Sequence, residues 1–457
     1  MSIEAAIDRI SALIGDRLST AKGIRDHHGE DAAYYTPTPP DAVAFPNDTA
    51  EVSEIMKICN DESCPIIPYG VGTSLEGHIQ PIRGGVTLDM ANMNKVLAIH
   101  QEDMDAVVQP AITREALNED LRATGLFFPV DPGANASIGG MTATRASGTT
   151  AVRYGTMREN VLALEVVLAD GRIIRTGTRA KKSSAGYDLT KLMIGSEGTL
   201  GVITEITVRL QGQPESITSA TCAFPSMESA VNTVIQTIQM GVPMARIEVI
   251  DPTTIRAVNA YKKMELLEQP SLFVEFHGSE AGAQEQAETF GMIAEENGCE
   301  GFEWAKSLED RNRLWTARHH GYFAMMAAYP GTKPITTDVC VPISNLAEAV
   351  IESMAEAKAR GFDAPLVGHA GDGNFHMTFM VDPDKPEEMV AAKELAHEMN
   401  RRALRFDGTC TGEHGVGIGK QKYMAEEHGE GWSVMADIKR ALDPNNILNP
   451  GKVVQIN

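Results

Sequence analysis

The expected secondary structure changes character near Gln211–Glu215, and this change limits the possible folds more than any other feature of the sequence. Before it, short apolar runs typical of strands, such as Pro65–Tyr69, alternate with helices, such as the one predicted over Asp48–Glu62. After it, helical runs dominate and alternate with short strands such as Leu272–Phe276. Because a chain of 457 residues exceeds the size at which one hydrophobic core stops growing, we expect two domains, 1–214 and 215–457.

Composition excludes several classes of partner. With 40 basic and 62 acidic residues the net charge is -22, which repels nucleic acid and means that a small anionic substrate needs specific cations in its pocket. The six cysteines show neither Cys-x-x-Cys nor zinc-ribbon spacing, which indicates a reducing compartment. No stretch approaches the roughly 18 apolar residues of a membrane span, and the first residues lack a signal-peptide core. We therefore expect a cytoplasmic protein without a transmembrane segment, either free or peripheral at the inner face of a membrane.

Two histidines bracket a glycine turn in the segment His-Ala-Gly-Asp-Gly-Asn-Phe-His at 369–376. If Asp372-Gly373 forms a two-residue hairpin turn, the register places His369 directly opposite His376. Opposed side chains have Cβ atoms roughly 5 Å apart, so both imidazoles could reach one metal ion about 2.1 Å from each nitrogen. The alternative is a cross-strand surface pair that binds nothing.

A second glycine-flanked pair, Glu413-His414, follows in the segment Thr411–Gly417. Glu413 is our candidate for the third metal ligand. Three ligands leave coordination positions for water or a substrate oxygen, which favours a catalytic over a structural site. Two histidines and a carboxylate suit zinc, manganese or iron. The glycines around this pair suit a backbone that approaches a ligand closely, although an ordinary loop also uses them.

Three segments of small residues lie in the first half of the chain. They are Gly70–Gly77, Pro132–Gly140 together with Arg145–Gly148, and Gly195–Ile203. The first follows an expected strand, where exposed backbone amides commonly bind anions. Neither the Rossmann nor the P-loop fingerprint is complete, so we expect a different nucleotide site, in which one extended ligand contacts all three segments.

These three segments resemble the FAD-binding domain of the vanillyl-alcohol oxidase family, also called the PCMH type, over roughly residues 35–214. The resemblance implies an α+β fold with a PCMH-type FAD-binding domain of two α/β subdomains. It also implies a C-terminal substrate, or cap, domain of antiparallel sheet and helices, whose tail at about 443–457 returns to the flavin domain. Relatives with covalent flavin often carry histidine where this chain has Thr73, so we expect noncovalent FAD. The implied cofactor-binding residues are Gly70, Val71, Gly72, Thr73, Ser74, Pro132, Gly133, Ser137, Ile138, Gly139, Gly140, Ala146, Ser147, Gly148, Tyr154, Gly155, Gly198, Ile203 and Asn449.

Within that family the second half is most similar to D-lactate dehydrogenases of the cytochrome type, and next to the glycolate oxidase flavin subunit and D-2-hydroxyglutarate dehydrogenase. The segments at 314–319 and 336–344 carry this likeness. In these relatives the two-histidine motif and the Glu-His motif bind a divalent cation and place a base, which implies His369, His376 and Glu413 as metal ligands. Tyr322 and Thr378 depart from the pattern of the hydroxyglutarate enzymes, which weakens a dicarboxylate as the substrate.

Oxidation of a 2-hydroxy acid requires a fixed carboxylate and a deprotonated hydroxyl. Arg318 offers a planar fork for the carboxylate, and Lys333 could add a second positive charge; the alternative for both is a structural salt bridge. His414 is our candidate base because the unperturbed pKa of histidine, about 6.5, lies close to working pH. The alternative is that His414 is a further metal ligand.

We therefore expect an FAD- and metal-dependent enzyme that oxidises a D-2-hydroxy acid and passes electrons to a separate acceptor, which is a cytochrome, a quinone or an electron-transfer flavoprotein. D-lactate, oxidised to pyruvate, is the preferred substrate, with glycolate and D-2-hydroxyglutarate as alternatives. A homodimer is left open. The rival from a different class is a noncatalytic flavin-binding subunit of an oxidase complex, which would not need a complete base and metal set.

Overall fold

The computed structural model describes residues 2–305 and 307–456, without the side chains of Leu308, Ala317 and His319. The chain folds into two compact units. Unit 1 consists of Met1–Ser147, Gly155–Gln213 and Glu413–Asn457, and unit 2 of Gly148–Tyr154 and Pro214–Gly412. The segment that returns to unit 1 is thus longer than the tail of about 443–457 that we expected.

The first part of unit 1 is a four-stranded sheet covered by helices. Its elements are α1 (Ile3–Ile14), the 3-10 turn η1 (Gly15–Arg17), β1 (Leu18–Ser19), α2 (Lys22–His28), β2 (Ala42–Ala44), α3 (Thr49–Glu62), β3 (Ile66–Tyr69) and β4 (Val86–Asp89). The strand order among the described residues is β1-β2-β4-β3, with β2, β4 and β3 parallel. Asp48 caps α3 by accepting a hydrogen bond from the Glu51 amide, as its position in the sequence predicts.

The second part of unit 1 is an antiparallel sheet with the order β5-β6-β10-β8-β9 among the described residues. Its elements are β5 (Val96–His100), β6 (Asp105–Val108), α4 (Arg114–Leu121), η2 (Arg122–Thr124), β7 (Leu126–Phe127), α5 (Ile138–Thr144), α7 (Met157–Asn160), β8 (Val161–Val167), β9 (Ile173–Arg175), α8 (Leu189–Met193), β10 (Val202–Arg209) and β11 (Gln211–Gly212). Asp-Gly at 170–171 favours a turn, and β8 pairs with β9 in a hairpin around these two residues.

The returning segment, Glu413–Asn457, adds side chains to both hydrophobic cores of unit 1. It carries η4 (Gln421–Tyr423), α16 (Met424–His428) and α17 (Glu430–Leu442). Ile438 and Leu442 pack against the core of the antiparallel sheet, whereas Ile447 and Leu448 are buried in the core of the parallel sheet. The returning segment therefore contributes to both hydrophobic cores of unit 1.

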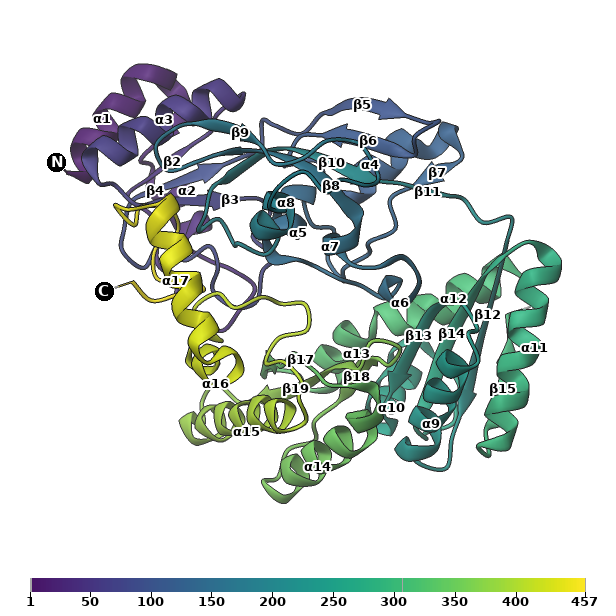
Figure 1. Cartoon of the computed structure of the whole chain (residues 1–457). Helices are drawn as coiled ribbons and strands as arrows, with labels where there is room; N and C mark the ends of the chain where they lie inside the picture. Colours follow the sequence, from purple (N-terminus) through teal and green to yellow (C-terminus); the bar gives the residue numbers. More distant parts are fainter. Residues whose placement is uncertain (1, 306, 457) are drawn as a thin grey trace. The chain divides into compact units, whose positions relative to one another are not determined.

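Unit 2 is built on one large antiparallel sheet (Figure 1). Among the described residues the order is β15-β12-β14-β13-β18-β19-β16, and β17 also pairs with β19. The elements are α6 (Ala151–Tyr154), β12 (Ser216–Ala223), α9 (Met227–Gln239), β13 (Met244–Ile250), α10 (Pro252–Lys262), β14 (Ser271–Gly278), α11 (Glu280–Glu296), β15 (Glu300–Trp304), α12 (Leu308–His319), α13 (Gly321–Ala328), β16 (Lys333–Thr336), β17 (Val339–Cys340), η3 (Ile343–Asn345), α14 (Leu346–Ala359), β18 (Leu366–His369), β19 (Asn374–Val381) and α15 (Pro386–Arg405).

The two faces of this sheet differ in chemistry. One face is apolar and packs against α9, α11, α14 and α15 (Figure 1). Strand residues alternate between faces. The opposite face therefore carries charged and ionisable residues that pair across neighbouring strands, such as Glu248 with His369 and Arg246 with Glu275. Polar side chains buried in the middle of a sheet require partners, and they are the first place to look for a functional site.

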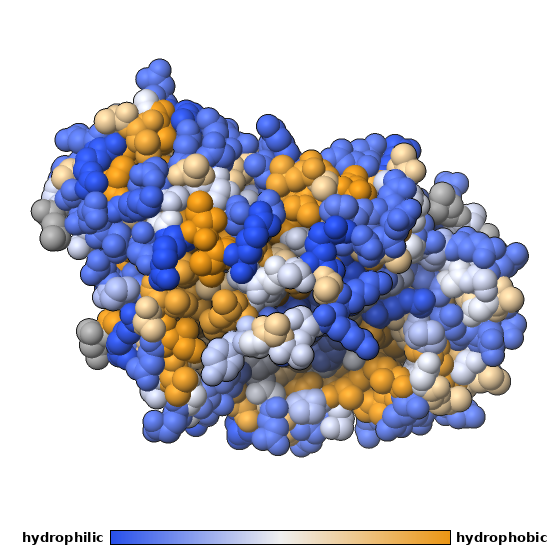
Figure 2. All heavy atoms as spheres, turned by 45° about the horizontal axis from the view of Figure 1, so that its top comes forward, coloured by the Kyte–Doolittle hydropathy of each residue, from blue (hydrophilic) through white to orange (hydrophobic). Residues whose placement is uncertain are grey.

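The α+β class predicted from the sequence is confirmed, with two sheet-and-helix parts in unit 1 and an antiparallel sheet with helices in unit 2. Within the described part of the chain, no helix is long and apolar enough to span a bilayer. Hydrophilic side chains cover most of the face in Figure 2, with apolar patches between them, in keeping with the net charge of -22.

Candidate active site

The two histidines of the 369–376 segment lie on one face of the unit 2 sheet, but not in the predicted register. His369, at the end of β18, pairs with Asn374, whereas His376 in β19 pairs with Val367. The predicted two-residue turn is therefore wrong, and four residues, 370–373, connect the strands. The shift is two residues, an even number, so both imidazoles stay on the same face as diagonal neighbours. Their ring centroids are 5.5 Å apart, and both residues are buried.

Gly373 explains why the connection has this length. Its φ of 76° is unfavourable for other residues, and its carbonyl oxygen accepts a hydrogen bond from the Val341 N–H at 3.0 Å. A Cβ at this position would lie 2.0 Å from the carbonyl oxygen of Val341. The neighbouring strand thus leaves no room for a side chain in the turn.

We predict that Gly373→Ala lowers the free energy of unfolding by at least about 2 kcal/mol, because the left-handed φ and the overlap with Val341 add together. Gly331→Ala is the matched control: Gly331 has a φ of 83° with no atom within 4 Å of its ideal Cβ. Urea unfolding of both variants measures the difference. Equal losses would show that the close approach to Val341 costs nothing.

Glu248 and Arg318 form a buried chain of polar contacts that ends on His369. Glu248 Oε1 lies 2.7 Å from His369 Nδ1, and Glu248 Oε2 accepts hydrogen bonds from Arg318 Nε at 3.0 Å and Nη2 at 2.5 Å. Burial alone would raise the pKa of Glu248, but the adjacent His369 and Arg318 outweigh it and lower the pKa. An ionised Glu248 accepts a hydrogen bond from Nδ1–H of His369, which leaves Nε2 as the ligand nitrogen.

His376 is oriented in the same way from the other side. Its Nδ1 lies 3.0 Å from the carbonyl oxygen of Thr337 and 3.7 Å from Asp338 Oδ1. Asp338 is fully buried and accepts hydrogen bonds from the Asn374 amide and the Thr411 hydroxyl. A carbonyl oxygen can only accept, so Nδ1 of His376 is the protonated nitrogen and Nε2 is again the ligand nitrogen. The donor set of both rings therefore fits a divalent metal ion.

A second carboxylate–imidazole pair lies on the same face of the sheet. Glu275 Oε1 is 2.8 Å from His277 Nε2, and Tyr154 Oη, which we expected to contact the cofactor, is 2.7 Å from His277 Nδ1. Burial opposes ionisation of Glu275, but His277, Arg246 and Arg311 lower its pKa to about 2. Tyr154 belongs to unit 2 and is tied to this pair.

The structure does not bring every predicted substrate residue to the histidines. Lys333 is exposed and pairs with Val381, whereas Thr336 pairs with Thr378. Alternation along β19 places Val381 on the face opposite to Thr378 and His376, so the register puts Lys333 on the other side of the sheet. Arg318 lies beside the site and forms a salt bridge with Glu248.

Glu413 and His414 begin the segment that returns to unit 1. Gly412, the last residue of unit 2, packs so closely that a Cβ there would lie 2.1 Å from Asn374 Nδ2 and 3.1 Å from Asp338 Oδ1. Glu413 follows one peptide bond later, which spans about 3.8 Å along the backbone. Gly412 thus allows the backbone to pass close to the side chains of Asn374 and Asp338, beside His376.

The three glycine-rich segments of unit 1 converge at the carboxyl end of β3. A Cβ on Gly70 would lie 2.4 Å from Ser137 Oγ, and one on Gly198 would lie 3.0 Å from Pro68 Cγ. Ser74 Oγ is buried and, among the described residues, has no hydrogen-bond partner. Converging backbone loops with an unsatisfied hydroxyl fit a ligand with several acceptor oxygens, such as a dinucleotide pyrophosphate.

Asn449, which we expected to contact the cofactor, bonds to the main chain beside the predicted cofactor loops. It is buried, and its amide donates to the carbonyl oxygens of His78 at 3.0 Å and Glu197 at 2.8 Å. Its Oδ1 accepts a hydrogen bond from Lys452 Nζ at 2.9 Å. Asn449 therefore connects the residue after the first predicted cofactor loop to the third loop through their main chain. Ile138 and Ile203 are likewise core residues, so any contact of theirs with a cofactor would be through the backbone.

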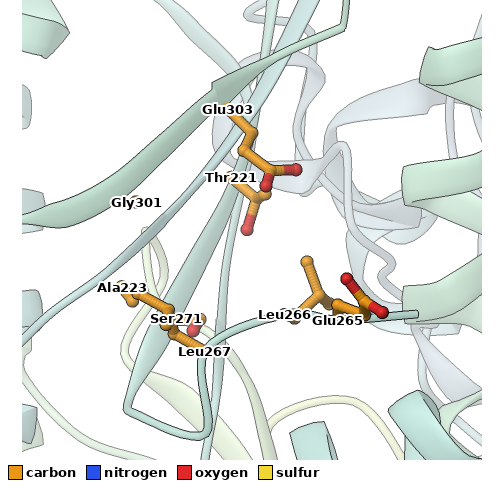
Figure 3. Close-up of a pocket in the computed structure, with 8 residues that line it drawn as sticks. All are labelled: Thr221, Ala223, Glu265, Leu266, Leu267, Ser271, Gly301 and Glu303. Carbon is orange, nitrogen blue, oxygen red and sulfur yellow. The ribbon is translucent and has the colours of Figure 1, made fainter.

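A pocket on unit 2 is lined by none of these residues. Figure 3 shows its lining, in which Glu303 of β15 and Thr221 of β12 lie together and Glu265 lies apart from them. None of the predicted ligands, substrate residues or cofactor contacts is among the lining residues. We therefore assign this pocket no part in the candidate site.

Comparison with known proteins identifies the class. The C-terminal domain of FAD linked oxidases matches residues 213–453, more than half of the chain, and an FAD binding domain matches residues 40–177. The chain therefore belongs to the FAD linked oxidase family and is an FAD-dependent oxidoreductase. The predicted resemblance is confirmed.

Individual relatives are similar over almost the whole chain. The chain is 48% identical to a probable mitochondrial D-lactate dehydrogenase of Danio rerio, over 100% of this chain and 93% of that protein. It is 47% identical to a mitochondrial D-lactate dehydrogenase (cytochrome) of Arabidopsis thaliana, over 98% of this chain and 80% of that protein. Among solved structures, p-cresol methylhydroxylase shares the fold with a TM-score of 0.81 at 17% identity, covering 98% of this chain and 96% of that one.

Proposed function

We propose that this protein oxidises D-lactate to pyruvate, with hydride transfer to noncovalent FAD and onward transfer of electrons to a separate acceptor. The observation that carries the proposal is the pair of buried histidines, each with Nδ1 fixed, in a chain whose similarity to D-lactate dehydrogenases extends over both units. A noncatalytic flavin subunit would have no use for two imidazoles oriented by a buried carboxylate and a carbonyl.

Each group has a separate task in the proposed reaction. When bound, FAD accepts the hydride, and a divalent ion held by His369, His376 and Glu413 lowers the pKa of the substrate hydroxyl. The carboxylate of Glu413 is the proposed third ligand because Gly412 packs beside the Asn374 and Asp338 side chains, one peptide bond away. His414 removes the hydroxyl proton as the general base.

Arg318 binds the substrate carboxylate in this proposal while it also holds Glu248. The contacts to Glu248 use Nε and Nη2, so the Nη1 edge of the guanidinium is the one offered to the substrate. Lys333 is left out of this proposal because of its position in the sheet register. With one cation at the carboxylate, a monocarboxylate is favoured over a dicarboxylate.

Turnover with an artificial electron acceptor tests the proposal. We expect activity with D-lactate, lower activity with glycolate and D-2-hydroxyglutarate, and none with L-lactate. Acid precipitation should release the flavin, because Thr73 has no side chain that forms a stable flavin linkage. The absence of turnover with all four acids by a flavin-loaded, metal-loaded protein would favour the noncatalytic flavin subunit.

We predict that Glu248→Gln weakens metal affinity by about 10- to 100-fold, which is the usual effect of removing a carboxylate behind a histidine ligand. Competition with a chelator of known affinity measures this change directly. Glu303→Gln is the control, since Glu303 is an exposed glutamate of the same sheet that lies in the unassigned pocket. Equal metal affinities of Glu248→Gln and the wild type would remove Glu248 from the site.

A further inference from the structure

The loop after His414 is held by a buried carboxylate of unit 1 that no step of the proposed reaction uses. Glu197 accepts hydrogen bonds from the Val416 N–H at 2.6 Å and from the Gly417 N–H at 2.8 Å, one on each carboxylate oxygen. Its side chain is 2% exposed. The two amides lie two and three residues after His414, so the carboxylate fixes the backbone that carries the proposed base.

The fit between Glu197 and this loop is close. Gly415 has a φ of 86°, and a Cβ there would lie 2.7 Å from Glu197 Oε1 and 2.6 Å from His78 Nε2. A side chain at position 415 would therefore push the loop away from the carboxylate. The glycine at position 415 of the Gly-Glu-His-Gly-Val-Gly motif is thus explained by its close contacts with Glu197 and His78.

The charge of Glu197 is maintained inside the protein. His78 Nε2 lies 3.3 Å from Glu197 Oε2. Burial would raise the pKa of Glu197, but His78 and the two backbone amides outweigh it and lower the pKa. An ionised carboxylate accepts hydrogen bonds on both oxygens and binds amides about twice as strongly as a neutral group.

The backbone of Glu197 is itself fixed among the predicted cofactor loops. Its φ is 54°, a left-handed conformation that is unfavourable for a glutamate, and its N–H donates to the Ala143 carbonyl at 2.9 Å. Its own carbonyl accepts the Asn449 amide at 2.8 Å. The residue before Gly198 therefore connects the loops that we assign to the flavin with the loop that follows His414.

We propose that Glu197 is a positioning residue, which holds the 414–417 loop against the flavin-binding loops so that His414 stays in place for proton removal. This role rests on the proposed function. Both ends of the connection lie in unit 1, and the connection explains why a charged residue occupies a strained, buried position.

The test compares Glu197→Gln, Glu197→Asp and Asp443→Asn, all as flavin-loaded full-length protein. Asp443 is the matched control because it is also a buried carboxylate that accepts two amides of the returning segment, those of Ile447 and Leu448. Amide hydrogen exchange is measured on a peptide that covers 413–419. Flavin content and the rate of anaerobic flavin reduction by D-lactate are measured on the same samples.

We expect Glu197→Gln to keep FAD, to exchange faster at 413–419 and to lose about 100-fold in reduction rate, the usual cost of a misplaced reacting group. The charge-conserving Glu197→Asp should recover part of the rate, and it replaces Glu197→Gln if that variant does not fold. Asp443→Asn should leave exchange at 413–419 and the reduction rate of folded protein unchanged.

Three results would overturn the proposal. The first is unchanged exchange at 413–419 in Glu197→Gln, and the second is an unchanged reduction rate despite faster exchange. Loss of FAD in both Glu197 variants would also overturn it, since the residue would then serve the cofactor site. If wild-type protein is reduced by no D-2-hydroxy acid, the proposed function fails, and exchange alone still decides whether Glu197 holds the loop.

Discussion

Replacing His414 with alanine is expected to lower the rate of flavin reduction by D-lactate by about 100- to 10,000-fold, the range for loss of a general base. The hydroxyl proton of the substrate would then have no acceptor positioned by the protein. FAD should remain bound, because the predicted flavin contacts at 70–74, 137–140 and 198 do not include this residue. Metal content should also remain, since His414 is proposed as the base and not as a ligand. Anaerobic stopped-flow spectroscopy of the flavin measures the rate.

The control for this variant is His428→Ala, which removes an exposed histidine of α16 in the same returning segment. Its reduction rate should equal that of the wild type. Fast reduction of the His414→Ala protein would exclude the base assignment, and loss of metal from it would show that His414 is a ligand.

His376→Ala should have the second large effect, a loss of tightly bound metal and of about three orders of magnitude in turnover. Lewis-acid stabilisation by a bound ion contributes several kcal/mol, and about 1.4 kcal/mol corresponds to a tenfold change in rate. The flavin spectrum should be unaffected because His376 lies in β19 of unit 2, whereas the flavin-binding loops of unit 1 lie elsewhere in the chain. Metal analysis of the purified variant, together with its turnover number, checks the prediction.

His277→Ala distinguishes a metal ligand from any buried histidine on this face. His277 is buried and bonded to Glu275, as His369 is to Glu248, but it lies in β14 and is no proposed ligand. Its variant should keep the metal, whatever its effect on stability. If His376→Ala retained stoichiometric metal, or if His277→Ala lost it, the two-histidine site would be wrong.

Local sequence patterns predict much of the fold. Asp48 as the cap of α3, the buried face at Val52, Ile55 and Met56, and the hairpin at Asp170-Gly171 all follow from short-range rules of capping, periodicity and turn formation. The class of protein followed from the resemblance of the glycine-rich segments to the FAD-binding domain of the vanillyl-alcohol oxidase family. These features depend on residues close in sequence, so one chain suffices to predict them.

The register of the two-histidine hairpin could not be predicted in the same way. Asp-Gly favours a two-residue turn, but Gly373 instead fits against Val341 of a third strand segment, which lengthens the connection. Both imidazoles still lie on the same face of the sheet, because the register is shifted by an even number of residues. Tertiary packing thus changed the local turn without changing which side of the sheet carries the imidazoles.

The partners that lie far away in the sequence were the main feature of the candidate site that the sequence analysis did not predict. Glu248 lies 121 residues before His369 and Glu197 lies 219 residues before Val416, and no motif connects either pair. A signal was nonetheless present for Glu248, since Arg246 and Glu248 interrupt an otherwise apolar strand at alternate positions. Charges with that spacing predict a polar sheet face. Lys333 was misplaced in our scheme because its face depends on the pairing of β16 with β19, which the sequence does not specify.

The most direct measurement is the visible spectrum of the purified protein under anaerobic conditions as D-lactate is added, before and after removal of metal by a chelator. We predict that the metal-loaded protein is bleached and that the metal-free protein, with FAD still bound, stays yellow until the ion is restored. A metal-loaded protein that stays oxidised, or a metal-free protein that is bleached equally fast, would contradict this prediction.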